Sequence, residues 1–149
     1  MESKCSLCTF HLGDCWFGIA VEKVLEVMPA PPVTPVPLAP RAVAGLVNRR
    51  GQIVPVIDIG CRLGFPKQPA AVSRAMVVVR SDDTMLGLLV DGAGEVVEAP
   101  EEAFEAAPAN LPAESRDLVT RVCKLPGHLL HVLDVDRATG VEVAASLWQ

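Results

Sequence analysis

The feature of this chain that most restricts its fold is an internal repeat. The segment GIAVEKVLEV at 18–27 recurs as GLLVDGAGEV at 87–96, and GQIVPVIDI at 51–59 recurs as GHLLHVLDV at 127–135. Two blocks that recur in the same order indicate one small structural unit duplicated within a single chain. A pair of like units in 149 residues leaves little room for a buried active site, but it presents a large surface to partners.

The composition fits a core-forming protein, either one ordinary domain or two very small units that share a core, because 50% of the residues are hydrophobic. A net charge of −5, with four Phe, two Trp and no Tyr, argues against binding to a nucleic-acid backbone or to stacked bases. No apolar run approaches the roughly 20 residues that span a bilayer, and the N-terminus lacks the layout of a signal peptide. We therefore expect a cytoplasmic protein with no nucleic-acid partner and no direct membrane insertion.

Short apolar runs separated by turn residues dominate the chain and predict β-strands. About five such strands in each half, without a long amphipathic helix, predict an all-β fold of two small five-stranded barrels with short helical turns. Closure into barrels hides strand edges that would otherwise aggregate. Within a single domain spanning 1–149, we place the two units at about 5–65 and 70–140, linked near 64–69, with terminal elements open to exchange between them.

Two stretches look irregular. Pro29 to Pro40 contains six prolines, which remove amide donors and favour a constrained, extended loop. Residues 98–114 are rich in Ala, Glu and Pro without a strong period, and are expected to form a long exposed crossing. Pro55 lies inside an apolar run, which predicts a sheet edge, a bulge or a barrel corner.

Five cysteines are expected to be free thiols in a reducing compartment, because an odd number does not complete a disulfide framework. Cys5 and Cys8 form a CxxC pattern with His11 three residues on, so a thiol-redox or metal-binding protein using Cys5, Cys8 and Cys15 is the alternative function. On a strand, Cys5 and Cys8 would point to opposite faces, and no second Cys/His pair completes a zinc site. Small semi-apolar strand residues are the favoured interpretation.

The candidate catalytic acids and bases are Asp58, Asp91, Asp134, His11, His128 and His131. Asp58 and Asp134 occupy equivalent positions of the two repeats, at the ends of apolar runs, where carboxylates commonly cap a following turn. The sequence shows no nucleophile and base set, no phosphate loop and no metal-ligand spacing. We therefore expect neither an enzyme nor a cofactor or metal.

The segment GLVNRRGQIVPVID at 45–58 resembles the signature G-x-x-N-L-R-G-x-x-x-P-V-x-D of the CheW family. Other blocks agree with the family in order and spacing, namely 10–13, 18–27, the prolines before Gly45, and 90–92. Together with the signature, they extend the likeness over about 8–138. The resemblance implies two five-stranded Src-homology-3-like barrels packed around a shared apolar core. It also implies a non-catalytic adaptor in chemotaxis-like signalling, which links the cytoplasmic tips of methyl-accepting chemoreceptors to the regulatory domain of a CheA-type histidine kinase.

The same resemblance assigns partner-binding roles to particular residues. Arg50 matches the signature arginine, and Glu26 matches an acidic residue that lies near it. Val24 and Val96 match positions of receptor contact. For these two valines, the alternative interpretation is plain core packing.

The signature turn departs from the family pattern, because Arg49 follows Asn48 where an apolar residue is usual. If both arginines lay on a strand they would face opposite sides, so only one could make the usual contact. An exposed salt bridge between Arg50 and Glu26 would contribute only about 0 to 1 kcal/mol to the stability of the fold. A binding role, in which Arg50 offers its planar donors to a partner's carboxylates or carbonyls, is the better explanation. The segment 119–122 lacks a glycine often found there, so its local geometry is expected to differ.

Overall fold

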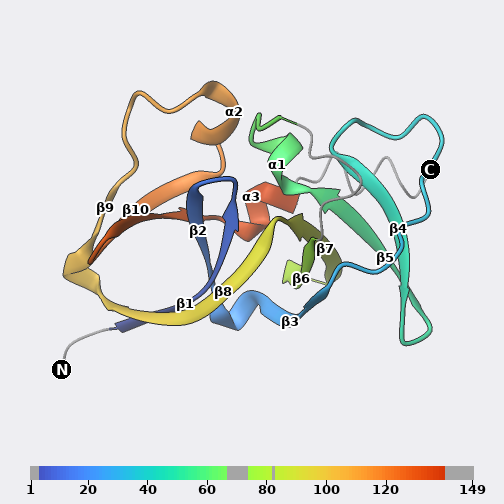
Figure 1. Ribbon diagram of the computed structural model, residues 1–149, viewed down its shortest axis with the longest axis horizontal. Coiled ribbons are helices and arrows are strands. Elements are labelled where there is room, and N and C mark those ends of the chain that lie inside the picture. The colour runs from blue at the N-terminus through green and yellow to red at the C-terminus, as the bar shows by residue number, and fades with distance from the viewer. Residues whose placement is uncertain (1–3, 67–73, 82, 140–149) are drawn as a thin grey trace.

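The computed structural model describes residues 4–66, 74–81 and 83–139, and most of them lie in two mixed β-sheets (Figure 1). The expected all-β fold is confirmed. The expected link near 64–69 lies partly outside the described residues. No helix in the described part of the chain is long and apolar enough to cross a membrane.

The larger sheet, sheet A, contains β1 (Lys4–Leu12), β2 (Cys15–Ala20), β8 (Gly92–Pro100), β9 (Phe104–Ala106), β10 (Val119–Leu125) and β11 (His128–Leu133). The smaller sheet, sheet B, contains β3 (Val24–Pro29), β4 (Val43–Arg49), β5 (Gln52–Asp58), β6 (Ala75–Ser81) and β7 (Thr84–Val90). Short helical segments connect them: η1 (Val21–Lys23), α1 (Ile59–Arg62), η2 (Glu101–Ala103), α2 (Ala113–Arg116) and α3 (Val135–Thr139).

The sequence repeat reappears as a repeated strand order with exchanged hairpins. Sheet A runs β8-β1-β2-β11-β10-β9, and sheet B runs β3-β6-β7-β5-β4. The β1–β2 hairpin from the N-terminal half pairs with strands of the C-terminal half, and the β6–β7 hairpin pairs with strands of the N-terminal half. Each sheet also has one parallel pair at the equivalent place, β2 with β11 and β7 with β5. Neither half of the chain therefore completes a sheet without the other.

Each sheet curls so that its two edges approach one another. In sheet A, β8 and β9 lie at opposite edges, although only η2 separates them along the chain. In sheet B, Thr34, shortly after β3, pairs with Leu46 on β4 at the other edge, with backbone hydrogen bonds of 2.9 and 2.8 Å. The exposed crossing expected at 98–114 is therefore wrong in part, because β8 extends to Pro100 and β9 supplies the sixth strand of sheet A.

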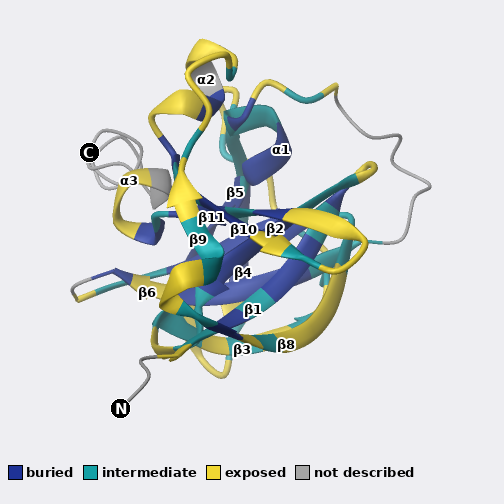
Figure 2. Ribbon diagram, turned by 90° about the vertical axis from the view of Figure 1, so that its left-hand side faces the viewer, coloured by how far each residue is buried: buried dark blue, intermediate teal, exposed yellow. Residues whose placement is uncertain are grey.

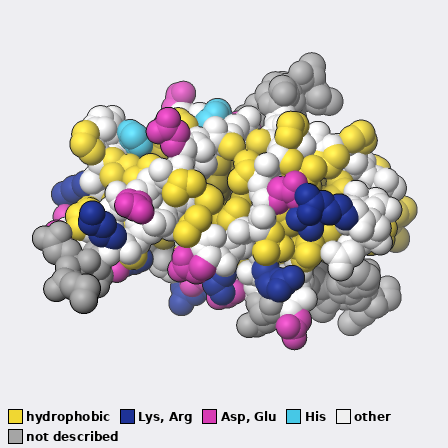
Figure 3. All heavy atoms as spheres, turned by 90° about the horizontal axis from the view of Figure 1, so that it is seen from below, with side chains coloured by type: hydrophobic (Ala, Val, Ile, Leu, Met, Phe, Trp, Pro, Cys, Tyr) yellow, Lys and Arg dark blue, Asp and Glu magenta, His cyan; other side chains and the backbone are white. Residues whose placement is uncertain are grey.

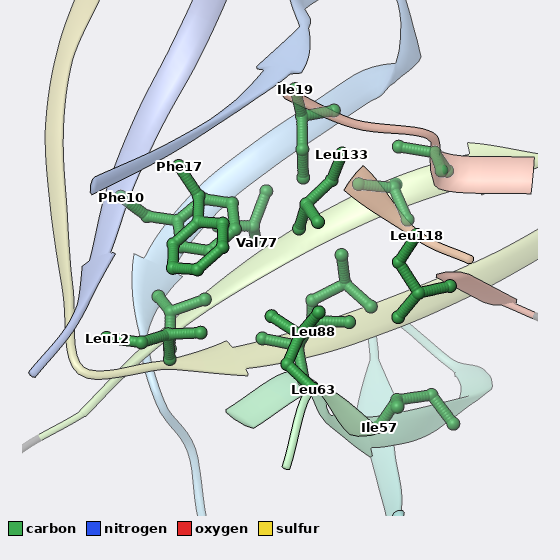
Figure 4. Packing of buried hydrophobic residues seen from close by; sticks show 14 of the residues in the cluster. Phe10, Leu12, Phe17, Ile19, Ile57, Leu63, Val77, Leu88, Leu118 and Leu133 are labelled. Atoms are coloured by element: carbon green, nitrogen blue, oxygen red, sulfur yellow. The ribbon is translucent and has the colours of Figure 1, made fainter. Parts of the chain in front are cut away.

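The core consists of three clusters. The largest lies between the sheets and draws Phe10, Phe17 and Leu133 from sheet A and Val77 and Leu88 from sheet B (Figure 4). Smaller clusters lie within each sheet alone. Figure 2 shows most buried residues on the strands, whereas β8 is largely exposed.

Strand β6 shows why the apolar runs are continuous instead of alternating. Val77 and Val79 belong to the cluster between the sheets, whereas Met76 and Val78 belong to the cluster inside sheet B. Both faces of the strand are therefore buried over 76–79, and each of these positions needs an apolar side chain.

Pro55 is accommodated next to a parallel ladder. It lies opposite Leu46 on β4, and the pairing of β5 with β7 begins only at Val56. The missing amide of Pro55 therefore lies outside the ladder with β7.

Candidate partner-binding surfaces

Glu26 on β3 is contacted by two arginines at the tip of the β4–β5 hairpin. Nη2 and Nε of Arg49 lie 2.7 and 2.9 Å from Glu26 Oε2, and the Arg49 side chain is 14% exposed. Nη2 of Arg50 lies 3.6 Å from Glu26 Oε1, and the Arg50 side chain is 76% exposed. The structure thus brings together the three charged residues selected from the sequence, and Arg49 is the close partner of Glu26.

The condition under which Arg49 and Arg50 would face opposite sides is not met, because Arg50 is not part of the strand. Strand β4 ends at Arg49, and Arg50 and Gly51, with φ of 52° and 84°, form the turn that leads into β5. Positive φ at both central residues is the pattern of a type I′ hairpin. Asn48 Oδ1 accepts a hydrogen bond from Gly51 N at 2.9 Å, so Asn48 shapes this turn.

An exposed apolar surface lies on β3 and β8. Leu25 and Val27 are 41% and 44% exposed, and Val96 is 59% exposed. Figure 3 looks onto the side of the molecule where β3 and β8 lie in Figure 1, and hydrophobic side chains gather across its middle. Val24, in contrast, is half-buried and packs against the cluster between the sheets.

A groove of about 390 Å³ adjoins this surface, between the end of β3 and the start of β8. Its lining is mainly apolar and consists of Val27, Met28, Pro29, Ala75, Gly92 and Ala93, together with Arg74 and Asp91. Arg74 donates to both oxygens of Asp58 at 3.1 and 3.3 Å and lies 3.8 Å from Asp91 Oδ1. Arg74 is thus engaged with two carboxylates of the chain itself, and the rest of the lining is apolar, so the groove suits an apolar partner.

The carboxylates considered as catalytic acids hold the backbone in place. Asp58 Oδ1 accepts from Cys61 N at 3.2 Å and Asp134 Oδ1 accepts from Arg137 N at 3.2 Å, which confirms that both cap the following turn. Asp91 Oδ2 accepts from Gly13 N at 2.6 Å in the β1–β2 turn. These contacts give each carboxylate a structural role.

The histidines pack against aromatic rings of β2. The rings of His11 and His128 lie 5.1 and 5.9 Å from Trp16, and His131 lies 5.3 Å from Phe17. His131 Nδ1 also lies 3.0 Å from the Trp16 carbonyl oxygen. Such contacts are typical of histidines that complete a core edge.

The five cysteines are free thiols. A hydrogen bond to Glu101 raises the pKa of Cys5, and burial raises the pKa of Cys8 and of Cys123. A raised pKa lowers the fraction of thiolate, the form that reacts or binds metal. Among the residues described, no three His, Cys, Asp or Glu side chains are grouped so that they could hold a metal ion.

Sequence reasoning missed Leu25, Val27 and Arg74. Every second residue of β3 is exposed and the others are half-buried, but Leu25 and Val27 are apolar like the half-buried Val24 and Met28, so the pattern of hydrophobicity does not reveal them. Arg74 precedes β6 without any local motif, and its partners are Asp58 at the end of β5 and Asp91 just after β7.

Comparisons with known proteins agree with this architecture. A family model described as CheW-like domain matches residues 6–141. The chemotaxis protein CheW of Rhizobium meliloti (strain 1021) is 27% identical over 130 residues, which cover 87% of this chain and 84% of that protein. The chemotaxis protein CheW of Bacillus subtilis (strain 168) is 25% identical over 137 residues, covering 92% and 88%.

A solved structure supports the same fold. The scaffolding protein TtCheW from Thermoanaerobacter tengcongensis superposes with a TM-score of 0.84, at 24% identity and with 96% of each chain covered. The chain therefore belongs to the CheW-like domain family, to which the chemotaxis proteins named CheW are also similar.

Proposed function

We propose that the protein is a cytoplasmic adaptor that couples chemoreceptors to a CheA-type histidine kinase. The observation that carries the proposal is the exposed apolar surface of Leu25, Val27 and Val96 beside the groove between β3 and β8. Membership of the CheW-like domain family supports the same role.

The apolar surface has the properties expected of a receptor-binding site. The receptor tip implied by the family is a helical hairpin, and helices dock through apolar residues spaced three or four positions apart. Val96 is central to this proposal because it is the most exposed of the three side chains. Val24 lies on the same strand as Leu25 and Val27, and we propose that it contributes at the half-buried edge of the site.

The kinase is proposed to use the charged tip of the β4–β5 hairpin. Arg50, Arg49, Glu26 and Asn48 gather there, and Ile53 beside them is 52% exposed. An apolar side chain next to an arginine guanidinium group is a common combination in protein–protein interfaces. Two separate surfaces are what a coupling protein needs to hold two partners at once.

The test is a binding measurement with the variant Val96→Asp. Titration calorimetry with a receptor signalling fragment should show an affinity at least about tenfold weaker, because a carboxylate would be buried at the interface. The midpoint of urea unfolding should not change, since Val96 is 59% exposed. Ile53→Asp, at a similarly exposed residue, is the matched control and should bind the receptor fragment normally.

The proposal would be wrong if the unchanged protein bound neither the receptor fragment nor the kinase regulatory domain at micromolar concentrations. No observation favours the thiol-redox or metal-binding alternative. Replacing Cys5, Cys8 and Cys15 together with serine should therefore leave receptor binding intact.

A further inference from the structure

The backbone at Arg50 is one that most residues avoid. Its φ of 52° lies in the left-handed region, and Asn, Asp or Gly is the usual choice at this position of a type I′ turn. Gly51, the next residue, has the expected identity for its φ of 84°. An arginine at Arg50 therefore contradicts the local preference of the turn, and such exceptions concentrate at functional sites.

The contacts of Arg50 within the chain do not account for its presence. Its guanidinium lies 3.6 Å from Glu26 Oε1 and its side chain is 76% exposed, so solvent screens the attraction. Arg49 already holds Glu26 through two nitrogens at 2.7 and 2.9 Å, and Arg49 Nη1 lies 3.8 Å from Met85 Sδ.

Arg49 has a structural position that Arg50 lacks. It ends β4, at one edge of sheet B, and Glu26 lies on β3, at the other edge. Their ion pair therefore crosses the same seam that the backbone pairing of Thr34 and Leu46 closes. With an exposed fraction of only 14%, Arg49 is shielded enough for this pair to contribute to closure.

We propose that the two arginines divide two tasks, so that Arg49 closes the seam and Arg50 is left free to bind a carboxylate of the partner protein. In this division Arg49 is a positioning residue, because it holds Glu26 at 2.7 and 2.9 Å and leaves Arg50 only a looser contact with Glu26 at 3.6 Å. The partner surface is acidic at this point and apolar beside it, to match Ile53, which is 52% exposed. The inference rests on the proposed function, since it names the chemistry by which the kinase recognises this hairpin.

The test compares Arg50→Asn with Arg49→Leu. Asn suits a positive φ, so Arg50→Asn should leave the urea unfolding midpoint unchanged or higher while removing the charge. Binding to the CheA regulatory domain should weaken about tenfold or more, and the dependence of Kd on salt should become shallower. Arg49→Leu should lower the unfolding midpoint and also weaken binding, because Glu26 then pairs with Arg50.

Arg116→Gln is the matched control, since it removes one exposed arginine on α2 without touching the hairpin. It should leave both affinity and salt dependence unchanged. Normal binding by Arg50→Asn, while the unchanged protein binds the kinase domain, would overturn the inference and leave the proposed function standing. An unfolding midpoint that falls for Arg50→Asn but not for Arg49→Leu would also overturn it. Failure of the unchanged protein to bind either partner would instead reject the proposed function.

Discussion

Two residues other than glycine adopt a positive φ in the described part of the chain, and they illustrate two different outcomes. Arg50 has an exposed charge at the tip of a hairpin, for which a binding role is proposed. Leu38 has a φ of 62° and is 104% exposed, so it combines backbone strain with an unburied apolar side chain. It occupies the third position of the turn from Val36 to Ala39, whose ends are joined by a hydrogen bond of 3.3 Å.

Replacing Leu38 should therefore stabilise the protein. Leu38→Asn is expected to raise the free energy of unfolding by about 0.5–1 kcal/mol, because Asn tolerates the left-handed region and no packing is lost. Urea unfolding measures this change. A decrease in the free energy of unfolding would mean that apolar contacts of Leu38 outweigh the strain of its backbone.

At the same scale, the sequence predicted Arg50, Arg49, Glu26 and Asn48 as candidate site residues and placed Glu26 near Arg50, whereas Arg49 is the closer of the two arginines. The distance from each arginine to Glu26 depends on where the turn begins, and a shift of one residue would exchange their roles. The type I′ turn places Arg49 on the strand and Arg50 at the tip, which decides the ranking.

Among the elements, the seam of sheet B requires a glycine. Gly45 has a φ of 148°, and a Cβ added there would collide with the carbonyl oxygen of Thr34. Both β4 and β10 have a register shift at the equivalent point, between Val43 and Gly45 and between Val119 and Arg121. Arg121 stands at the position equivalent to Gly45 and pairs with Ala106 on β9.

Gly45→Ala should accordingly open the seam. We expect the free energy of unfolding to fall by about 3 kcal/mol or more, because both the backbone conformation and the approach of Thr34 become unfavourable. Gly51→Ala is the control: its φ of 84° is also unfavourable for alanine, but an added Cβ meets nothing within 4 Å. It should cost no more than about 1–2 kcal/mol. Equal losses for the two variants would show that the approach of Thr34 is unimportant.

Across the whole molecule, hydrogen bonds and an ion pair reinforce the apolar core between the sheets. Asp136 on α3, which follows sheet A, accepts a hydrogen bond from Ser81 Oγ at the end of β6 at 2.6 Å. Lys23 Nζ lies 3.5 Å from the other oxygen of Asp136. The hydrogen bond from Ser81, and next the charge of Lys23, hold the pKa of Asp136 below its ordinary value of 3.8.

This link should make stability depend on pH. A pKa lowered in the folded state adds stability above the unfolded value of 3.8, and the contribution is lost as the pH falls through the folded pKa. The difference in free energy of unfolding between the unchanged protein and Ser81→Ala should therefore be constant near neutral pH and shrink below about pH 4. Urea unfolding of both proteins from neutral pH to about pH 3 measures it. A difference in free energy of unfolding that stays the same over this range would contradict the assigned role of the Ser81 hydrogen bond.

Short segments of the sequence determine much of this architecture. The repeat, the apolar runs and the turn glycines lie within short segments, and each acts through the backbone geometry of a few neighbours. They were enough to predict the strands, most hairpins, the caps at Asp58 and Asp134, and the family. The assignment of 98–114 as a crossing failed in part, since the three residues of η2 carry the chain from one sheet edge to the other without any periodic signal.

Long-range pairing settled the remaining features. Each hairpin joins the sheet of the opposite repeat, and no segment of either hairpin alone specifies that choice. The groove between β3 and β8 and the contact of Glu26 with Arg49 follow from it, because both join strands that are distant along the chain. The repeat therefore predicts which strands and turns form. The candidate binding surfaces arise only once each hairpin has joined the sheet of the opposite repeat and the edges of each sheet have met.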